Sequence, residues 1–379
     1  MSRRPKLVLI HPFVPEYRRR LYDRLELECD NIGITFIVAA GTPSPKMLAR
    51  QDAAGGNWAK QVPTKWLSLG SKELGYRDLR QLELCAGDYI IVEHAVKNIE
   101  TYSLLLRQRR NKTRIAMWGQ GKTYSTRQSK MLSSLKKNLT KRFEWFFVYT
   151  QNGLESLTGA GFPTDRITVL NNTIDTTALR LKLDEVTVAE QKQVRTKFGL
   201  FKEHTGIFIG GVDKAKGIEF LVDTATAIGK VDPLFRLLIV GEGSLSEKVR
   251  IAQASGAPII HFGRAEGSTK AQLLSVSDLM LIPNWIGLVA VDSLVSGVPI
   301  VSTYHFSHSP ERDYLIDNET SFFSEHNVFS YANLVVKLLR DPATRGEASE
   351  QCIIESHKYS IDNYVNNFVN GIQAWMKSD

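Results

Sequence analysis

Residues 281–301 limit the possible folds of this chain more than any other stretch. They read Leu-Ile-Pro-Asn-Trp-Ile-Gly-Leu-Val-Ala-Val-Asp-Ser-Leu-Val-Ser-Gly-Val-Pro-Ile-Val. The apolar start and the Pro-Asn break predict a buried parallel strand that ends at a loop. The apolar positions between Leu288 and Val295 suit the buried face of a short helix, which Gly297 and Pro299 end before another strand. The stretch therefore predicts a strand–loop–helix–strand unit of a parallel α/β sheet.

The loop of this unit is a predicted ligand site. It follows the carboxyl end of a strand, and the N-terminus of the helix points the same way. Free backbone N–H groups and the helix dipole favour negative charge at such a place. We therefore expect an anionic ligand beside this loop.

The same unit resembles the nucleotide-sugar site of retaining glycosyltransferases of the GT-B fold, family 4. Gly287–Val289, Gly297 and Pro299–Val301 are in register with that family's Gly-Leu, Gly and Pro-Val-Val positions. The family's Glu-x7-Glu motif is degenerate here. Asn284 stands at the first glutamate and Asp292 at the second, with the same seven-residue gap.

The resemblance implies an α/β fold of two Rossmann-like domains facing a cleft (GT-B), with a C-terminal helix that crosses back to the N-terminal domain. The length agrees, because 379 residues are too many for one ordinary core. Strand-like and helix-like segments also alternate in both halves of the chain. We expect an acceptor-binding domain at residues 1–172, a nucleotide-sugar-binding domain at 173–358 and the C-terminal helix at 359–379.

Local patterns place the elements of the N-terminal half. Apolar runs predict strands, and helical spacing predicts the helices between them. The segment 41–80 is rich in Gly, Pro and Lys, so it is expected to form loops with one short strand at 65–69. The expected strands of this half are 6–10, 32–40, 89–93, 114–118, 146–150 and 167–170.

Positive charge is concentrated in one segment. The chain has a net charge of +8, but residues 101–150 alone hold twelve Lys or Arg residues and a single acid, Glu144. Their net charge is therefore 12 − 1 = +11. A local field of this sign attracts phosphates, nucleic acid or anionic lipid.

Six of these twelve cations fall on a predicted basic helix at residues 127–147, which also carries a stripe of Leu and Phe residues. One interpretation is a docking face for an anionic membrane surface or for a lipid-diphosphate acceptor. The other is a solvated helix face above a buried apolar stripe. Nucleic acid is not an expected partner, because no aromatic–basic recognition motif accompanies the charge.

Other sequence features indicate the cellular compartment of the protein. No apolar run approaches the roughly 20 residues that span a bilayer. The run Leu7–Ile10 is too short for a signal-peptide core and is expected to be the first strand. Cys29, Cys85 and Cys352 are scattered, which fits a reducing compartment and indicates neither zinc nor disulfides. We expect a cytoplasmic protein, peripheral at the inner membrane face.

The first candidate site is the glycine-rich loop Gly210–Gly217. Glycines let the backbone approach a diphosphate, and a lysine can neutralise charge that grows on a leaving group. The family has Gly-Arg-x4-Lys-Gly here, so the resemblance implies that Lys216 binds the diphosphate. Gly211 occupies the Arg position, and Lys214 could substitute in part. The alternative is an ordinary turn with a solvent-exposed lysine.

The resemblance also implies that Asp292 binds the ribose hydroxyls and Asn284 the sugar. The alternatives are an exposed helix aspartate and a turn asparagine after Pro283. Glu242 and Arg264 follow strand ends where the family holds the nucleotide. The expected donor-binding residues are Gly210, Gly211, Lys214, Lys216, Glu242, Arg264, Asn284, Gly287, Leu288 and Asp292.

Two further groups of residues are weighed. An acidic position after the last strand of the unit falls on Glu311 or Asp313, and the sequence does not choose between them. His305 and His308 lack a clear third ligand, so no metal site is expected.

In the N-terminal half, His11, His94, Gln120 and Lys122 follow strand ends and are the expected acceptor-binding residues. The expected catalytic residues are Lys216, Asn284 and His94.

The resulting prediction is a glycosyltransferase, retaining and metal-independent, that uses a UDP- or GDP-sugar donor and no cofactor. Its expected acceptor is lipid-linked or belongs to an envelope glycan. A rival interpretation is a non-catalytic GT-B subunit that partners an active transferase. Three departures from the family allow this rival: Gly211 for Arg, Asn284 for Glu and Gln120 for His. A nucleotide-sugar hydrolase or epimerase is disfavoured because no clear acid–base set is present.

Overall fold

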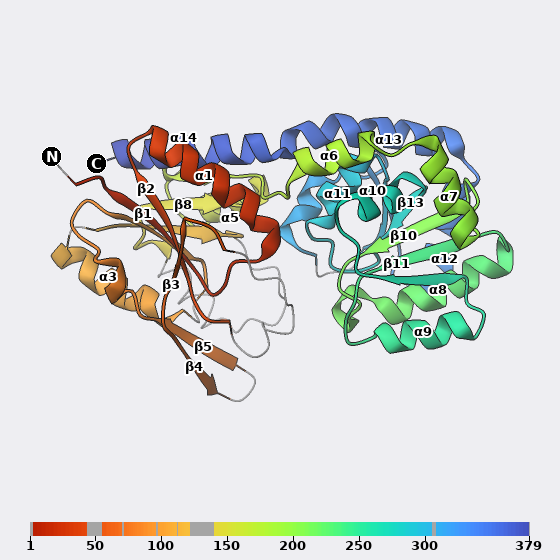
Figure 1. Cartoon of the computed structure of the whole chain (residues 1–379), viewed down its shortest axis with the longest axis horizontal. Coiled ribbons are helices and arrows are strands. Elements are labelled where there is room, and N and C mark those ends of the chain that lie inside the picture. The colour runs from red at the N-terminus through yellow and green to blue at the C-terminus, as the bar shows by residue number, and fades with distance from the viewer. Residues whose placement is uncertain are drawn as a thin grey trace. The chain divides into compact units, whose positions relative to one another are not determined.

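The computed structural model describes residues 3–43, 55–69, 72–95, 98–111, 113–121, 140–304 and 308–378 (Figure 1). The chain divides into two compact units. The N-terminal unit comprises Met1–Asp175 together with Ile361–Asp379, and the C-terminal unit comprises Thr176–Ser360. Each unit has a parallel sheet of its own.

The sheet of the N-terminal unit has seven strands in the order β3-β2-β1-β6-β7-β8-β9. All neighbouring strands pair in parallel. A purely parallel sheet requires cover on both faces. The strands are β1 (Lys6–His11), β2 (Thr35–Ala40), β3 (Ala59–Gln61), β6 (Tyr89–Glu93), β7 (Arg114–Gly119), β8 (Trp145–Val148) and β9 (Ile167–Val169).

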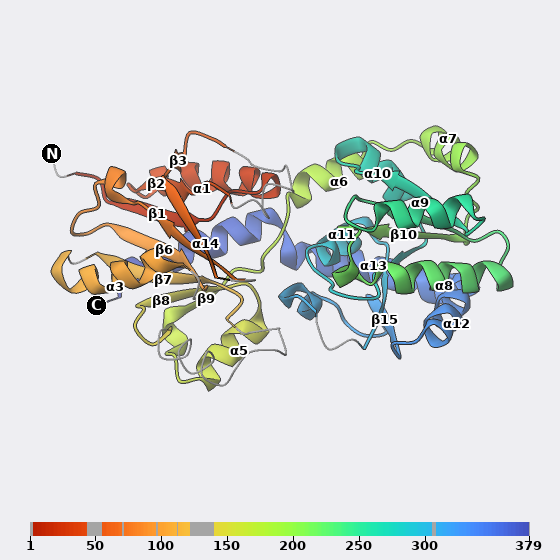
Figure 2. The ribbon, with the colours of Figure 1, turned by 90° about the horizontal axis from the view of Figure 1, so that it is seen from below.

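Successive side chains of β1 enter different cores, because side chains alternate along a strand. Leu7 and Leu9 pack in one cluster with residues of α1 (Arg19–Asn31) and α14 (Ile361–Lys377). Val8 and Ile10 pack in another with residues of α3 (Ile99–Asn111) and α5 (Gln151–Gly159). Figure 2 shows α1 and α14 on one side of the strands and α3 and α5 on the other.

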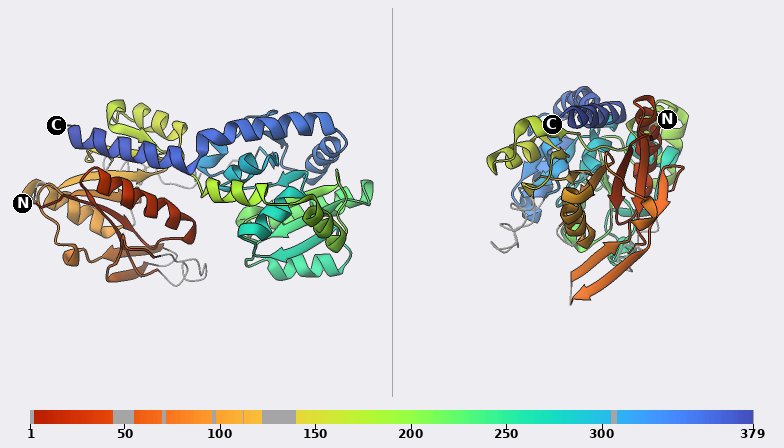
Figure 3. Two further views of the ribbon diagram at one scale, coloured as in Figure 1. Left: turned by 45° about the horizontal axis from the view of Figure 1, so that its top comes forward. Right: turned by 90° about the vertical axis from the view of Figure 1, so that its left-hand side faces the viewer.

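A two-stranded antiparallel hairpin, β4 (Thr64–Leu69) and β5 (Lys72–Arg77), projects from this unit (Figure 3). The expectation of loops with one strand across 41–80 is correct for β4 and wrong for β3 and β5. Residues 72–77, Lys-Glu-Leu-Gly-Tyr-Arg, contain no apolar run. The strand β5 forms instead through its backbone ladder with β4, which leaves no local apolar signature.

The C-terminal unit has a six-stranded parallel sheet in the order β12-β11-β10-β13-β14-β15. The strand order reverses between β10 and β13, which is where ligands bind in such sheets. Helices cover both faces, with α6, α10, α11 and α13 on one and α8, α9 and α12 on the other (Figure 1). The strands are β10 (Thr205–Ile209), β11 (Arg236–Val240), β12 (Ile259–Gly263), β13 (Leu279–Leu281), β14 (Ile300–Thr303) and β15 (Ser321–Ser324).

The helices of this unit follow their strands closely. The unit begins with α6 and α7, and Thr187 caps α7 with a capping box to Glu190. The helices are α6 (Thr176–Asp184), α7 (Val188–Phe198), α8 (Ile218–Val231), α9 (Ser246–Ala254), α10 (Gly267–Ser275), α11 (Val289–Ser296), α12 (Val328–Leu339) and α13 (Pro342–Ser356).

The predicted strand–loop–helix–strand unit is confirmed as β13, α11 and β14. The helix α11 ends at Gly297, and all its residues except Ser296 are buried. Its burial explains why the apolar residues Val289, Ala290, Val291, Leu294 and Val295 are spread around the helix rather than confined to one stripe.

The predicted basic helix at 127–147 lies largely outside the described residues, which resume at Thr140. Its predicted C-terminal end is wrong, because Trp145–Val148 is the buried strand β8. The aromatic run at 145–147 pairs with β7 and favours a strand over a helix. No helix in the described part of the chain is long and apolar enough to cross a membrane.

Candidate functional site

The loops after β10 and β11 are joined at the carboxyl edge of the C-terminal sheet. The Asp213 carboxylate accepts hydrogen bonds from the Ser244 backbone N–H at 2.9 Å and its hydroxyl at 2.8 Å. Gly241 has a φ of 144°, and a Cβ on it would lie 1.9 Å from the Gly210 carbonyl oxygen. Only glycine fits this close approach, so the two loops form one continuous backbone surface.

Lys216 reaches from the first of these loops to the loop after β13. It ends the short 3-10 helix Lys214–Lys216, and its Nζ donates a hydrogen bond of 2.7 Å to the Trp285 carbonyl oxygen. Burial lowers the pKa of Lys216 to about 8, and the charges of Glu311 and Asp213 oppose that fall. The ammonium group therefore stays mostly protonated at neutral pH.

Asn284 lies against the same loop. A Cβ on Gly217, which has a φ of 72°, would come within 3.0 Å of the Asn284 side-chain amide. The Asn284 Oδ1 atom is buried and has no hydrogen-bond partner within the described part of the chain. A buried carbonyl oxygen without a donor costs free energy, so this atom is suited to accept a hydrogen bond from a ligand hydroxyl.

Trp285 lies with Lys216 and Asn284 in what we call the Lys216 cluster. Trp285 was not predicted from the sequence as part of this site. Its φ is 48°, in the left-handed region that side chains other than glycine rarely adopt. This backbone conformation turns its carbonyl oxygen to Lys216. Strain of this kind concentrates at functional sites. The Pro-Asn-Trp sequence signals a turn but not its handedness.

The segment after β14 fixes the loop that carries Asn284 and Trp285. The Ile286 N–H donates to His308 Nδ1 at 3.3 Å, and the Ser309 N–H donates to the Ile286 carbonyl at 3.0 Å. The Thr303 hydroxyl donates to the Pro283 carbonyl at 2.8 Å. His308 therefore acts as a structural support of the loop in this arrangement.

Glu311 and Asp313 differ in their relation to the lysine. Glu311 is 4% exposed and accepts a hydrogen bond from the Ser309 hydroxyl. Its charge acts on the pKa of Lys216, whereas Asp313 is not among the groups that do so. Of the two acidic positions that the sequence left open, Glu311 is the one beside the Lys216 cluster.

Asp292 forms a buried ion pair that sequence analysis did not foresee. It is 6% exposed, and its Oδ1 atom accepts a hydrogen bond of 2.6 Å from Nζ of Lys270 in α10. The pair joins α10 to α11. Twenty-two positions separate the two residues, so no local pattern connects them.

The other expected donor-binding residues lie on neighbouring loops. A Cβ on Gly287 would sit 4.0 Å from Lys216 Nζ, and Leu288 precedes α11. The Glu242 carboxylate accepts from Arg250 Nη2 at 3.3 Å, and the Ser246 hydroxyl lowers its pKa. Lys214 and Arg264 are exposed. The structure thus brings Gly210, Lys216, Asn284 and Gly287 together.

His11, an expected acceptor-binding residue, has a core position in the N-terminal unit. It is 7% exposed, and its Nε2 lies 2.6 Å from the Tyr22 hydroxyl. Burial lowers the pKa of His11 well below its usual value, and the positive charges of Arg18 and Arg77 lower it further. The imidazole is therefore neutral at pH 7.

His94 and Gln120 follow the neighbouring strands β6 and β7. The His94 Nε2 atom lies 3.3 Å from the Thr140 hydroxyl, and its ring meets Phe146 edge-on at 5.0 Å. The Gln120 carbonyl oxygen lies against Gly153, 2.7 Å from where a Cβ would stand. Lys122 lies outside the described residues.

No three His, Cys, Asp or Glu side chains gather as metal ligands among the residues that the structure describes. His308 supports the loop described above, and His305 lies outside the described residues.

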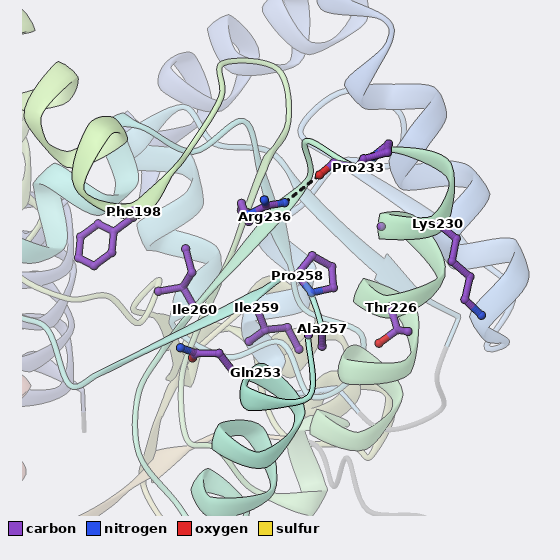
Figure 4. A pocket seen from close by; sticks show the side chains of 12 residues that line it. Phe198, Thr226, Lys230, Pro233, Arg236, Gln253, Ala257, Pro258, Ile259 and Ile260 are labelled. Atoms are coloured by element: carbon purple, nitrogen blue, oxygen red, sulfur yellow. Dashed lines mark hydrogen bonds between the residues drawn. The ribbon is translucent and has the colours of Figure 1, made fainter.

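A pocket of about 510 Å³ opens at the opposite edge of the C-terminal sheet (Figure 4). Arg236 starts β11 and Pro258 precedes β12, so the pocket lies at the amino ends of these strands. The Arg236 guanidinium donates to the Pro233 carbonyl at 2.9 Å. None of the expected site residues lines this pocket, so it is separate from the Lys216 cluster.

Comparison with known families bears on the same region. Residues 203–341 match the glycosyl transferases group 1 family. This group 1 region contains the Lys216 cluster and the Lys270–Asp292 pair. No curated protein matches the chain.

Solved structures show the fold. The chain is similar to Anabaena Alr3699/HepE in complex with UDP, with 13% identity, a TM-score of 0.68 and coverage of 97% of this chain and 99% of that one. A glycosyltransferase from Rickettsia africae ESF-5 shares 11% identity, with a TM-score of 0.70 and full coverage of both chains. The lipopolysaccharide outer core galactosyltransferase WaaB, in its apo form, shares 13% identity, with a TM-score of 0.61 and coverage of 97% and 99%. The prediction of a GT-B fold with two Rossmann-like domains, each containing a parallel sheet, is confirmed.

Proposed function

We propose that the protein is a glycosyltransferase that moves a sugar from a nucleotide-diphosphate sugar to an acceptor hydroxyl. One observation carries the proposal most: a partly buried lysine and an amide oxygen without a partner among the described residues meet at the sheet edge where open α/β sheets bind ligands. The cluster lies inside the group 1 region.

In this proposal Lys216 and the backbone at Gly210 and Gly211 bind the donor diphosphate. The ammonium group stabilises the negative charge that develops on the departing diphosphate. Asn284 accepts a hydrogen bond from a sugar hydroxyl and positions the sugar. Rate then comes from positioning and from electrostatic stabilisation, with no protein nucleophile.

Asp292 is assigned to the ribose hydroxyls. Its Oδ1 atom is held by Lys270, so the assignment uses the second carboxylate oxygen. The Lys270 bond fixes the orientation of the carboxylate, which reduces the entropy lost when a ligand binds. Glu242 and Arg264, on the neighbouring loops, are assigned to the nucleoside part of the donor.

The donor nucleotide and the class of acceptor are proposed from the similar solved structures. HepE is described in complex with UDP, which favours UDP over GDP as the donor nucleotide. WaaB is described as a lipopolysaccharide outer core transferase, which favours an envelope glycan or lipid-linked acceptor. We propose a retaining, metal-independent reaction, with His94 and Gln120 on the acceptor side.

We further propose that the basic segment 127–147 attaches the protein to an anionic membrane surface. The support is its charge, because each surface Lys or Arg contributes about 1 kcal/mol to binding anionic lipid. Co-sedimentation with vesicles of phosphatidylglycerol and phosphatidylcholine tests this attachment. Replacing Lys136 and Lys137 by glutamate should abolish binding to the anionic vesicles. Equal binding by the wild type to neutral vesicles would contradict it.

A non-catalytic subunit is the alternative function. Gly211 in place of a second cation and Asn284 in place of a carboxylate favour it, as does the Lys270–Asp292 pair that engages one expected ribose ligand. Such a subunit would bind a nucleotide sugar without consuming it.

Calorimetric titration with UDP, GDP and their common sugar conjugates tests the donor site. Lys216→Ala should weaken binding of the preferred nucleotide about tenfold or more, because one buried cation at a diphosphate is lost. Lys230→Ala is the matched control, since Lys230 is an exposed lysine that lines the pocket at the opposite sheet edge. The donor-site assignment fails if no nucleotide binds, or if both variants bind like the wild type.

A further inference from the structure

Arg18 is a buried cation that forms no ion pair with a carboxylate in the described part of the chain. It ends the short 3-10 helix Glu16–Arg18 after β1 and is 5% exposed. In the part of the chain that the structure describes, the groups acting on its charge are tyrosines. Burying an ion without a counter-charge costs several kcal/mol. This cost makes a negatively charged ligand a natural partner for Arg18.

The guanidinium is held in a fixed orientation. Its Cζ atom lies 4.5 Å from the centre of the Trp118 ring. Its Nη2 lies 3.4 Å from both the Tyr149 hydroxyl and the Asn172 Oδ1 atom, and its Nε donates to the Tyr17 hydroxyl at 3.1 Å. These partners are neutral oxygen atoms, so they orient the cation without neutralising it.

Three hydrogen-bond donors at this site, one of them on the Arg18 guanidinium itself, have no acceptor in the described part of the chain. They are Nη1 of Arg18, Nε1 of Trp118 and the hydroxyl of Tyr364, all buried and without a hydrogen-bond partner among the residues that the structure describes. Burial raises the pKa of Tyr364 to about 12, while the charge of Arg18 and the side-chain N–H groups of Arg18 and Trp118, which face its hydroxyl, lower it, so the three groups are neighbours. Most buried polar atoms in proteins are paired. Three unpaired donors around one cation are therefore informative.

The nearby titratable groups form no ion pair with Arg18 among the described residues. The pKa of Tyr149 is raised by burial and by the charge of Glu93, so its hydroxyl is neutral at pH 7. Glu93 is not among the groups that act on the pKa of Arg18 itself. Burial and the positive charges of Arg18 and Arg77 keep His11 neutral as well. The cation at Arg18 therefore remains available to an anion.

The position of the donors is that of a ligand site. Arg18 follows β1, Trp118 is the penultimate residue of β7, and Tyr149 and Asn172 follow β8 and β9. They all lie at the carboxyl edge of the N-terminal sheet, where ligands bind in open α/β folds. Tyr364 is supplied by α14, which belongs to the same unit.

We propose that Arg18, Trp118 and Tyr364 form a binding site for one oxyanion group, a phosphate or a carboxylate. A guanidinium and two neutral N–H or O–H donors match the several acceptor oxygens of such a group. Assigning the group to the sugar acceptor rests on the proposed glycosyltransferase function. The oxyanion site itself does not depend on that function.

Calorimetric titration of the full chain with inorganic phosphate and with acetate tests the site. All proteins carry Lys216→Ala, so that the expected donor site does not contribute. Arg18→Gln should weaken binding about tenfold or more, because it removes the charge of the site. Stronger binding of phosphate than of acetate would assign a phosphorylated group, and the reverse would assign a carboxylate.

Tyr364→Phe keeps the test decisive if Arg18→Gln fails to fold. Its hydroxyl has no partner, so removing it should leave the Tm unchanged or raised, and any loss of anion affinity then reports the site. Tyr331→Phe is the matched control, because the buried Tyr331 hydroxyl donates to the Val301 carbonyl at 2.7 Å in the other unit. The Tm of the Tyr331→Phe variant should fall, and its affinity for the anion should stay the same.

The proposal is overturned if neither anion binds the Lys216→Ala protein, or if binding is unchanged in both Arg18→Gln and Tyr364→Phe. Nucleotide binding by the protein with Lys216 intact distinguishes this failure from failure of the proposed function. A protein that binds UDP but no phosphate at Arg18 keeps its donor site and lacks the oxyanion site.

Discussion

The Lys216 ammonium group donates a hydrogen bond of 2.7 Å to the carbonyl oxygen of Trp285, a residue with a φ of 48°. This bond joins the glycine-rich loop after β10 to the loop after β13. It spans the reversal in strand order, since β10 and β13 are neighbours in the sheet. The cation is thus fixed at the place where the fold favours a ligand.

Donor affinity should fall as the pH rises through about 8. The pKa of Lys216 is lowered to about 8, so the cation is present below that pH and lost above it. Between pH 7 and pH 9 the protonated fraction falls about tenfold, and nucleotide affinity should fall by the same factor. Titrations across this range measure the effect.

Lys216→Ala is the control for this pH dependence, and its weaker affinity should not change between pH 7 and pH 9. An equal pH dependence in the wild type and the variant would show that another group is responsible. An ordinary exposed lysine would titrate near 10.4 and produce no change in this range.

Gly241→Ala should destabilise the C-terminal unit strongly. The added Cβ would lie 1.9 Å from the Gly210 carbonyl oxygen, so the two loops must separate. We expect a loss of roughly 3 kcal/mol or more in the free energy of unfolding, measured with urea. Gly256→Ala is the matched control, because Gly256 has a φ of 90° with no atom within 4 Å of an added Cβ.

The control should lose only the roughly 1–2 kcal/mol of left-handed backbone strain. Equal losses in Gly241→Ala and Gly256→Ala would mean that the close approach of the loops contributes nothing.

Local sequence signals account for much of the fold. The Pro-Asn break at Pro283 and the stop at Gly297 and Pro299 place β13, α11 and β14 correctly, because proline and glycine act on the backbone directly. The strand β5 and the end of the basic helix at Trp145 were predicted wrongly. Pairing with β4 and with β7 decides both, and no window of local sequence contains those partners.

The contacts of the candidate site depend even more on residues distant in the sequence. Asn284 and Lys216 could be singled out from motif spacing, but the unpartnered Oδ1 of Asn284 and the bond to Trp285 appear only in three dimensions. Lys270 and Arg18 carry no motif at all. The importance of Lys270 lies in its buried ion-pair partner, and that of Arg18 in its burial without one among the described residues. Neither burial nor pairing can be read from the sequence.

Asp292 and Lys270 should be coupled in stability. Removing one member of a buried ion pair leaves the other charge unbalanced, so Asp292→Ala and Lys270→Ala should each lower the free energy of unfolding by about 2 kcal/mol. The double variant should lose less than the sum of the two. Urea unfolding of the four proteins gives the coupling energy. Additive losses would show that the 2.6 Å contact contributes no net stability.

Acceptor-dependent release of the nucleoside diphosphate tests the central claim most directly. The preferred nucleotide sugar is incubated with the protein and a membrane glycolipid fraction, and the free UDP or GDP is measured. We expect release that requires the acceptor fraction and that falls about a hundredfold in Lys216→Ala, while Lys230→Ala retains it. Nucleotide binding without any release, or release that Lys216→Ala leaves unchanged, would contradict a transferase that acts through this site.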